Sequence, residues 1–521
     1  MFFSGTPLLP DPQNPAFYLP NIIFLFTDTD TGFIISVFLH ALVSGAGIYL
    51  LGRNFNFTKS VSLICAFLYI ASPRLASYLE AGHYGLVTAW AWFPWVMIAT
   101  MKIKDKLSLR WAVALAFFLS LIYFSHILTF AILVAANGLF FFFYGKLSVK
   151  KLILFGFSHL LLAAAVSPIL IAQVNWQRET TRDLLLSVPD TYPVWNGKLE
   201  FIKNLFLASR DTEKNIIIGL PVLFLSLIGL SKVRRGIKVI IITAGIIITL
   251  VTLNNVSPVY GILSHQNWFL LLRVATRFWF VIIIPTILLT GYSLLSGGRV
   301  LKAIAVLAII ESVAASMFIL SKAVPVPNAL PDEAYEFLES DSGTYRVFCL
   351  DLCIPQKQAA IYNLELVEGY GTLQQKNYYR QSQQLAQAFY RNRYTLAIPP
   401  FEIYLYENLQ PVAAELAKFR VKYVLSKNAL RDENLKPIRR FGQHIMYQNL
   451  LYTDPDYLIY TPNRIRVKTE GKNLIVIPEV YSKGWRAYAD GAREIPVFET
   501  KDARREVRPS QNTNFVDFIY N

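Results

Sequence analysis

Charged residues are scarce in this chain: they make up 16% of its 521 residues, whereas hydrophobic residues make up 54%. An ordinary soluble protein carries about 25% charged residues. The deficit argues against a chain surrounded only by water and suggests that lipid forms part of its surroundings. The length also exceeds that of one ordinary domain, so we expect two or more domains.

Cysteine is scarce as well, with only Cys65, Cys349 and Cys353. Cys65 lies in an apolar run, where a packing role is expected. Cys349 and Cys353 flank a Leu-Asp-Leu segment and could form a disulfide, but buried, unpaired thiols are the favoured interpretation. Nowhere in the sequence do Cys and His follow a zinc-site spacing.

Several motifs of soluble enzymes and of transport ATPases are absent. The sequence contains no Walker A, GxGxxG, HExxH or GxSxG motif. This argues against a transport ATPase and against a hydrolase built on those motifs. The first residues, MFFSGTPLLPDPQNP, are neither basic nor continuously apolar and do not resemble a signal peptide.

The formal net charge of +15 is unevenly distributed. Residues 1–321 hold 24 basic and 12 acidic residues, whereas residues 322–521 hold 26 and 23. The excess lies in short loops between apolar runs, as the positive-inside rule for membrane proteins describes. A nucleic-acid site would gather the positive charge on one folded face. We therefore expect the lipid bilayer as a partner of the chain and expect no nucleic-acid partner.

A helix that spans a membrane needs about 20 mostly apolar residues. The first part of the chain contains a series of apolar runs that approach this length. The stretch 108–144 is too long for one crossing, and we divide it at Phe124-Ser125-His126 into a tight helical hairpin. The predicted spans are 33–51, 60–78, 85–101, 108–123, 127–144, 152–173, 216–231, 237–253, 274–295 and 301–320.

The loops between these runs alternate in charge. Loops 52–59, 102–110, 145–151, 232–238 and 297–302 hold two to four basic residues each, whereas 79–84 and 124–126 hold none. The positive-inside rule places the basic set in the cytoplasm. We therefore expect a multi-pass protein of the cell membrane. Its predicted parts are an extracytoplasmic loop 1–32, a transmembrane helical domain 33–320 with outer loop 174–215, and an extracytoplasmic domain 321–521.

Residues 321–521 contain more charge and no further long apolar run. The segments TYRVFCL, VKYVLSK, NRIRVKTEG and KNLIVIPEV show the alternation or the β-branched enrichment typical of strands. Asp490-Gly491 lies between two strand-like runs, which predicts a hairpin. The fold class expected is a polytopic α-helical membrane protein with about ten spans and a C-terminal α+β domain that ends like a β-sandwich.

Polar groups gather on the predicted outer side. Glu80 and His83 share a very short outer turn, where a carboxylate and an imidazole could perform acid–base chemistry or bind a metal or phosphate. Capping of two helix ends explains the pair equally well. Arg273 and Arg277 lie one helical turn apart where the chain re-enters the membrane, and could bind the phosphate of a lipid-linked donor. The alternative for the arginines is snorkelling toward lipid headgroups.

Several segments resemble YfhO-like bacterial membrane proteins. They are GTPLLPDPQNPAFYLPN (5–21), EAGHYGLVTAWAWFPWV (80–96), LRVATRFWF (272–280), VKYVLSK (421–427) and YSKGWRAYADGAREIPVF (481–498). That family is similar to the GT-C class of glycosyltransferases, which take a sugar from a polyprenyl-phosphate donor. The resemblance implies a GT-C-like bundle and transfer of that sugar to a cell-envelope glycan or polymer acceptor on the outer face.

The resemblance also implies roles for single residues. Asp11, Glu80 and His83 would be catalytic, Arg273, Arg277 and Gln13 would bind substrate, and a divalent metal is a candidate cofactor. Relatives begin with a cytoplasmic N-terminus and a spanning helix, and continue past FVDFIYN. We therefore expect this chain to lack the first helix and the C-terminal end, with Asp11 as a substitute for the usual acidic residue. A non-catalytic membrane scaffold or envelope-assembly protein is the alternative function.

Overall fold

The computed structural model of the chain describes residues 4–181, 194–209, 211–266, 268–269, 274–295, 297–321, 330–371, 373–386, 397–398 and 409–520. Contacts divide the chain into two compact units. The helical unit comprises residues 12–173 and 186–323, and the mixed unit comprises residues 1–11, 174–185 and 324–521. Each unit has hydrophobic cores of its own.

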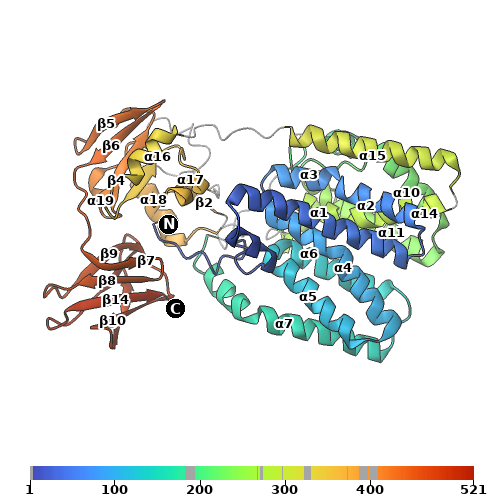
Figure 1. Ribbon diagram of the computed structural model, residues 1–521, viewed down its shortest axis with the longest axis horizontal. Helices are drawn as coiled ribbons and strands as arrows, with labels where there is room; N and C mark the ends of the chain where they lie inside the picture. The colour runs from blue at the N-terminus through green and yellow to red at the C-terminus, as the bar shows by residue number, and fades with distance from the viewer. Residues whose placement is uncertain are drawn as a thin grey trace. The chain divides into compact units, whose positions relative to one another are not determined.

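Apolar helices build the helical unit, and helical structure coincides with each predicted span (Figure 1). The helices are α1 (Thr29–Asn54), α2 (Lys59–Ile70), α3 (Pro73–Glu80), α4 (Tyr84–Lys106), α5 (Leu109–Ser125), α6 (Ile127–Phe143), α7 (Val149–Gln177), α10 (Leu220–Lys232), α11 (Arg235–Thr252), α14 (Phe280–Leu295) and α15 (Arg299–Leu320). Shorter elements are η1 (Leu19–Leu25), α9 (Lys198–Phe206), η2 (Asn254–Val256), α12 (Tyr260–Leu263) and η3 (Ala275–Trp279).

Within the described residues, seven helical stretches are long and apolar enough to cross a membrane. Two of these stretches are composite, because α2 continues into α3 and η3 continues into α14. Three further apolar helices, α5, α6 and α10, are shorter. The prediction of a polytopic α-helical membrane protein is confirmed.

Local sequence signals set the helix ends. The side chain of Asp28 accepts hydrogen bonds from the backbone N–H groups of Asp30 and Thr31 and so caps α1. Helix α5 ends at Ser125, and the extended residue His126 caps α6 by accepting a hydrogen bond from the backbone N–H of Thr129 at 3.1 Å. The predicted break at 124–126 is therefore confirmed.

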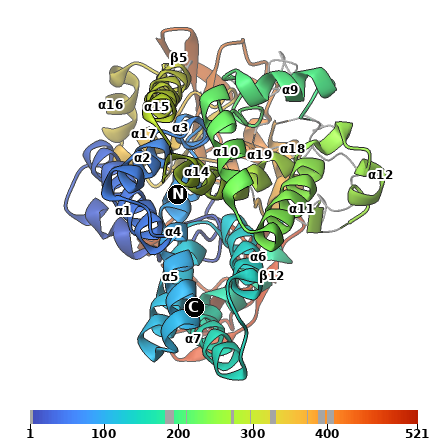
Figure 2. The same ribbon diagram turned by 90° about the vertical axis from the view of Figure 1, so that its right-hand side faces the viewer.

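Helix α4 contributes the largest share of the core of the helical unit, and α14 contributes to it as well; Figure 2 shows both among the surrounding helices. There the ring of Trp90 stacks on Phe280 with 4.6 Å between ring centroids. Helices α7, α11 and α15 differ, because only 17%, 11% and 22% of their most apolar windows are buried. Their apolar side chains are suited to contact lipid rather than other helices.

Helices α10 and α14 approach each other closely at Gly229. A Cβ atom at this position would lie 1.8 Å from the carbonyl oxygen of Leu289. Small residues allow such backbone approach between membrane helices. Gly229→Ala is therefore expected to destabilise the helical unit by about 1–3 kcal/mol through overpacking. Thermal unfolding in detergent would measure this effect.

The matched control for that substitution is Gly245→Ala on α11. Nothing lies within 4 Å of a Cβ built at Gly245, and alanine is a better helix former than glycine. The control should melt at or above the temperature of the unaltered chain. Equal melting temperatures for the two variants would contradict the close approach at Gly229.

A four-stranded sheet forms the first part of the mixed unit. Its order is β1 (Arg346–Cys349), β4 (Val421–Ser426), β6 (His444–Asn449) and β5 (Leu435–Phe441), with β1 parallel to β4 and the other neighbours antiparallel. Val424 belongs to one hydrophobic core, whereas Tyr423 and Leu425 belong to the other, as expected for successive strand residues that face opposite sides. The flanking helices are α16 (Asp332–Glu339) and α17 (Gln356–Ile361) on one side and α18 (Lys376–Ala386) and α19 (Ala413–Ala417) on the other.

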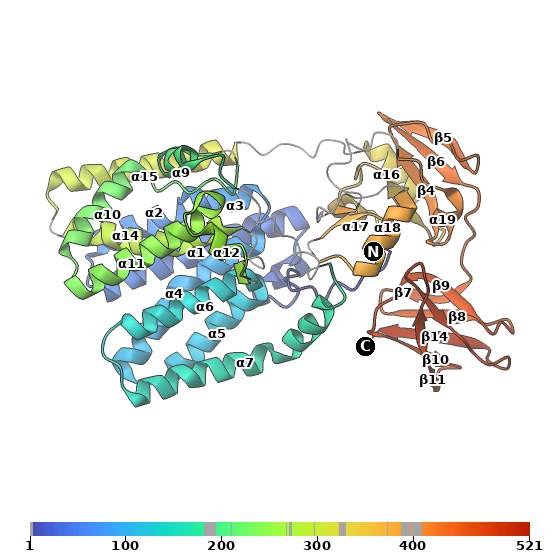
Figure 3. The same cartoon turned by 180° about the vertical axis from the view of Figure 1, so that it is seen from behind.

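Two more sheets form the end of the chain, and Figure 3 shows their strands side by side. One has the order β11 (Arg493–Ile495), β10 (Trp485–Ala489), β14 (Phe515–Tyr520), β8 (Arg464–Lys468), β7 (Tyr457–Thr461), and the other β12 (Val497–Glu499), β13 (Arg504–Val507), β9 (Ile475–Val480). A separate two-stranded pair joins β2 (Gly369–Tyr370) to β3 (Ala397–Ile398).

These two larger sheets share one hydrophobic core and so form a β-sandwich. Ile477 from the three-stranded sheet and Phe518 from the five-stranded sheet both lie in this core. Strands β10 and β11 form the predicted hairpin. It turns at Asp490 and Gly491, which both have positive φ, a conformation that Asp and Gly tolerate well.

A buried ion cluster joins the four-stranded sheet to the sandwich inside the mixed unit. Glu479 of β9 accepts hydrogen bonds from Arg346 of β1 at 2.6 Å and from Arg420, which immediately precedes β4, at 2.7 Å. Glu365 pairs with the same two arginines at 3.4 and 2.9 Å. Burial alone would raise the pKa of Glu479, but the arginines outweigh it and hold that pKa below its usual range.

Candidate functional site

A buried polar cluster lies in the helical unit where α3, η3 and the loop before α10 meet. At its centre, the carboxylate of Glu213 accepts hydrogen bonds from the hydroxyl of Tyr78 at 2.6 Å and that of Thr276 at 3.0 Å. Guanidinium nitrogens of Arg74 and Arg277 lie 3.8 and 3.5 Å from its oxygens. Three segments that are distant in the sequence thus meet at one carboxylate.

Arg74 holds the cluster together. Its side chain is 1% exposed, and it donates hydrogen bonds to the hydroxyl of Tyr78 at 2.7 Å and to the backbone carbonyls of Thr212, Asn215 and Thr276 at 2.8, 3.0 and 2.9 Å. These carbonyls belong to the loop before α10 and to η3. Arg74 therefore fixes both segments to α3.

Arg277 is held more loosely than Arg74. Its contact with Glu213 spans 3.5 Å and its side chain is 15% exposed. Within the described part of the chain, its Nε has no hydrogen-bond partner. A guanidinium presents several donors in a planar fork that suits phosphate and carboxylate groups. Arg277 therefore keeps one donor that no described group uses, and part of its side chain is exposed.

His83 lies in the turn between α3 and α4, with its ring packed against Tyr78 at 5.4 Å between centroids. Burial lowers the pKa of His83, and the nearby charge of Arg277 lowers it further, while Glu213 opposes this shift. The imidazole is therefore neutral at neutral pH. A neutral imidazole can accept a proton.

The charges in the cluster do not balance. Burial alone would raise the pKa of Glu213, but Arg277 and Arg74 outweigh it and keep that pKa below its usual range. Glu213 is therefore ionised. Among Glu213, Arg74, Arg277 and the neutral His83, one carboxylate faces two guanidiniums, so this set carries one net positive charge. The cluster is thus suited to bind an anion.

Two predicted site residues, His83 and Arg277, come together in this cluster. Glu80 ends α3, three residues before His83, and is partly exposed. Gln13 is partly exposed and belongs to the segment before η1 in the helical unit. The substrate-binding role of Gln13 stays a prediction.

The two remaining predicted site residues are Asp11 and Arg273. Asp11 belongs to the mixed unit, and its catalytic role stays a prediction. Arg273 lies outside the described residues, so its pairing with Arg277 also stays a prediction.

Four members of the cluster, Arg74, Tyr78, Glu213 and Thr276, are not predicted from the sequence. Arg74 carried a usable signal, because a charged residue inside a predicted span is expensive to bury and usually has a specific partner. Glu213 lies within the predicted outer loop 174–215, where the sequence does not distinguish it from other acidic residues. Nothing in the sequence pairs it with Arg74.

The interpretation of Cys349 and Cys353 as unpaired thiols is wrong, because the two form a disulfide with 5.8 Å between their Cα atoms. The chain turns back just after β1, where Leu352 has a positive φ of 58°. That turn brings the two side chains together. Cys65 is buried and unpaired, as expected.

Helices able to span a membrane, followed by a C-terminal part rich in β-strands, define a polytopic membrane protein. Residues 15–322 match a membrane protein family described as the 6-pyruvoyl-tetrahydropterin synthase related domain, and the chain belongs to this family. This match confirms the coarser part of the expectation from the resemblance to YfhO-like proteins, namely that the chain belongs to a membrane protein family. The missing first helix and C-terminal end stay a prediction.

No curated protein sequence matches the chain significantly. Two cryo-EM structures of arabinofuranosyltransferase AftD from Mycobacteria, one of them a mutant, are similar to it at 13% sequence identity, with TM-scores of 0.46 and 0.47. The alignments cover 92% and 93% of this chain but 34% and 35% of the mycobacterial chains. The chain thus spans about a third of their length, and a likeness at this level decides neither activity nor substrate.

Proposed function

We propose that the chain is a membrane glycosyltransferase of the GT-C class, which transfers a sugar from a polyprenyl-phosphate donor to a cell-envelope acceptor. The observation that carries this proposal is the unbalanced positive charge of the buried cluster, with Arg277 loosely paired at 3.5 Å. A site of this kind is suited to a phosphate group. The adjacent neutral His83 supplies a proton acceptor.

The roles follow from the bond that is broken. Transfer cleaves the bond between the anomeric carbon of the sugar and a phosphate oxygen, so negative charge grows on the leaving phosphate. Arg277 would stabilise that charge. His83 or Glu80 would accept the proton of the acceptor hydroxyl. Glu213 would position Arg277 through their ion pair, and Arg74 would position the η3 segment that contains Arg277. Both are therefore positioning residues.

A divalent metal does not fit this cluster. Metal ions of the magnesium and calcium type prefer several carboxylate and carbonyl oxygens. Glu213 is already engaged by Tyr78, Thr276 and two arginines, and the cluster as a whole is positive. The cationic groups required near the leaving phosphate are therefore supplied by the protein.

The loop charges support an outward orientation of the site. The loop that contains His83 holds no basic residue, whereas the loops at the opposite helix ends hold two to four each. On the positive-inside rule the cluster and the mixed unit face away from the cytoplasm. Donors and acceptors outside the cytoplasm would then reach the site.

The test is transfer by the purified full chain in lipid vesicles. The assay offers radiolabelled polyprenyl-phosphate hexoses and pentoses together with a cell-envelope glycan fraction. We expect label to enter the glycan from one of these donors, and none from the corresponding nucleotide sugars. The absence of transfer from every polyprenyl-phosphate donor, or equal transfer from a nucleotide sugar, would contradict the proposal.

A further inference from the structure

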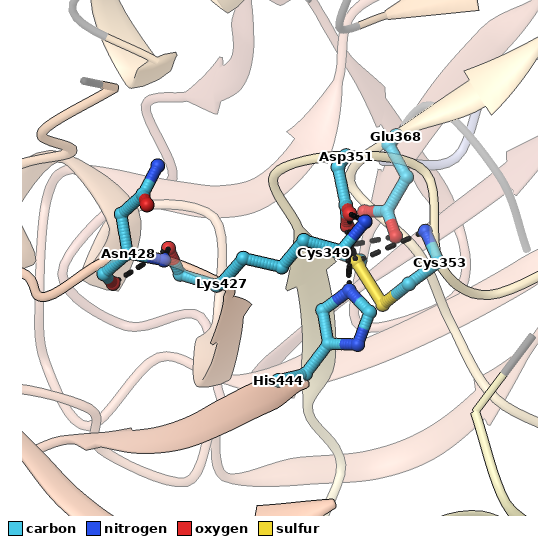
Figure 4. The surroundings of a disulfide bond; sticks show 8 residues. Cys349, Asp351, Cys353, Glu368, Lys427, Asn428 and His444 are labelled. Carbon is cyan, nitrogen blue, oxygen red and sulfur yellow. Dashed lines mark hydrogen bonds and ion pairs between the residues drawn. A yellow bond between two sulfur atoms is a disulfide. The ribbon is translucent and has the colours of Figure 1, made fainter. Parts of the chain in front are cut away.

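A second group of reactive side chains surrounds the disulfide of the mixed unit (Figure 4). Cys349 ends β1, and both cysteines are fully buried. His444 begins β6, and its Nε2 lies 3.0 Å from each carboxylate oxygen of Asp351. One donor atom each from Cys349, Asp351, Cys353 and His444 lies within 4.8 Å of the other three. The fold thus places four potential metal ligands at one point.

We propose that the chain with this disulfide reduced binds a thiophilic divalent cation such as Zn²⁺ through Cys349, Cys353, His444 and Asp351. Zinc accepts sulfur, imidazole and carboxylate ligands in tetrahedral coordination at about 2.0–2.3 Å, which places the ligand atoms about 3.5 Å apart. The donor atoms already lie within 4.8 Å of one another, so small displacements suffice. Four protein ligands and buried sulfurs are typical of a structural site rather than a catalytic one.

The surrounding charges fit such an ion. Two thiolates and the carboxylate of Asp351 carry three negative charges, so a bound Zn²⁺ leaves one. The ammonium group of Lys427 lies 2.8 Å from Asp351 and balances it. An ion pair of this kind at the edge of a metal site holds the ligand in place.

Further hydrogen bonds pre-organise the loop that carries the sulfurs. The backbone N–H of Cys349 donates to Glu368 at 3.0 Å, and that of Cys353 donates to Sγ of Cys349 at 3.0 Å. Glu368 is 1% exposed, and its Oε2 has no partner within the described residues. Because Glu368 is buried, water does not compete for the hydrogen bond that holds Cys349.

The disulfide and the metal exclude each other, because both use the same two sulfur atoms. Reduction consumes two electrons and two protons, which a dithiol supplies as it closes to a cyclic disulfide. A bound Zn²⁺ then displaces the two thiol protons. Every newly made chain carries free thiols, so the reduced form exists before the disulfide does. The metal would also link the loop that carries Cys349 and Cys353 to β6 through His444. The disulfide makes no such link, because it joins only the two cysteines.

The test uses Co²⁺ as a spectroscopic probe on the full chain in detergent. The chain is reduced with dithiothreitol, freed of the reductant without oxygen, and titrated with Co²⁺. We expect one equivalent to bind, with thiolate-to-cobalt charge-transfer absorption and the intense bands of tetrahedral cobalt, and Zn²⁺ to displace it. The unreduced chain, in which the disulfide is intact, should show none of these bands. This control requires no substitution, so impaired folding cannot explain its result.

Variants separate this site from other thiols and from weak surface binding. Cys65→Ser should leave the spectrum unchanged, whereas Cys353→Ser and His444→Ala should each lose the one-equivalent signal. Lys427→Met, which removes the ion pair to Asp351, should weaken binding about tenfold. Cobalt uptake by the reduced chain no greater than by the unreduced chain, or an unchanged spectrum in His444→Ala, would overturn the proposal.

Discussion

Glu479→Gln is expected to lower the unfolding free energy of the mixed unit by about 3–5 kcal/mol, the usual cost of removing one partner from a buried ion cluster. The side chains of Glu479, Arg346 and Arg420 are 1%, 0% and 2% exposed, so water cannot replace the lost charge. Glu365 would be left to face both arginines alone. Glutamine keeps the size of the side chain, so the effect isolates the charge.

Hydrogen–deuterium exchange of the full chain in detergent would measure this loss, since it reports on local segments without isolating the unit. Backbone amides of β8, β9 and β14 should exchange faster in Glu479→Gln. The matched control is Glu470→Gln, whose partner Lys472 lies at 2.9 Å with both side chains more than half exposed. That control should leave exchange unchanged, because exposed ion pairs contribute little. Equal exchange in both variants would show that the cluster is dispensable.

The helical part of the fold could be predicted because each spanning helix shows a local signal. A run of apolar residues is enough to specify such a helix, since the bilayer requires its backbone to be satisfied internally. The break at 124–126 was equally local, because it followed from the length of the apolar stretch. In the mixed unit, the Asp490-Gly491 turn was predictable for the same reason: both residues tolerate positive φ.

The candidate site was only partly predictable, because its centre depends on contacts between distant segments. His83 and Arg277 could be singled out as polar residues at the ends of apolar runs. Glu213 could not be placed beside Arg74 from sequence, since the hydrogen bonds that join their segments span 138 and 141 residues. The disulfide was missed for a different reason, namely a turn after β1 that depends on positive φ at Leu352, a conformation that leucine seldom adopts.

Arg277→Ala is expected to reduce sugar transfer by about 10²–10³-fold, the usual cost of removing one charged or oriented donor from a developing oxyanion. The melting temperature should fall less than in Arg74→Met, because Arg277 reaches Glu213 only at 3.5 Å, whereas Arg74 also donates to three backbone carbonyls. Arg277→Lys should restore part of the activity, since it returns the charge without the planar fork. The matched control is Arg110→Ala, at an exposed position near the start of α5, which should transfer sugar at the unaltered rate.

Comparison with Arg74 separates catalysis from architecture within the same cluster. Arg74→Met removes the hydrogen bonds to three backbone carbonyls, so it should lower both the melting temperature of the helical unit and the transfer rate. Arg277→Ala should lower the rate far more than the melting temperature. Glu80→Gln and His83→Ala together test the proton acceptor, and Asp11→Asn tests the role predicted for the first segment. If Arg277→Ala transferred sugar at the unaltered rate, the cluster would be structural and the leaving phosphate would have to be stabilised elsewhere.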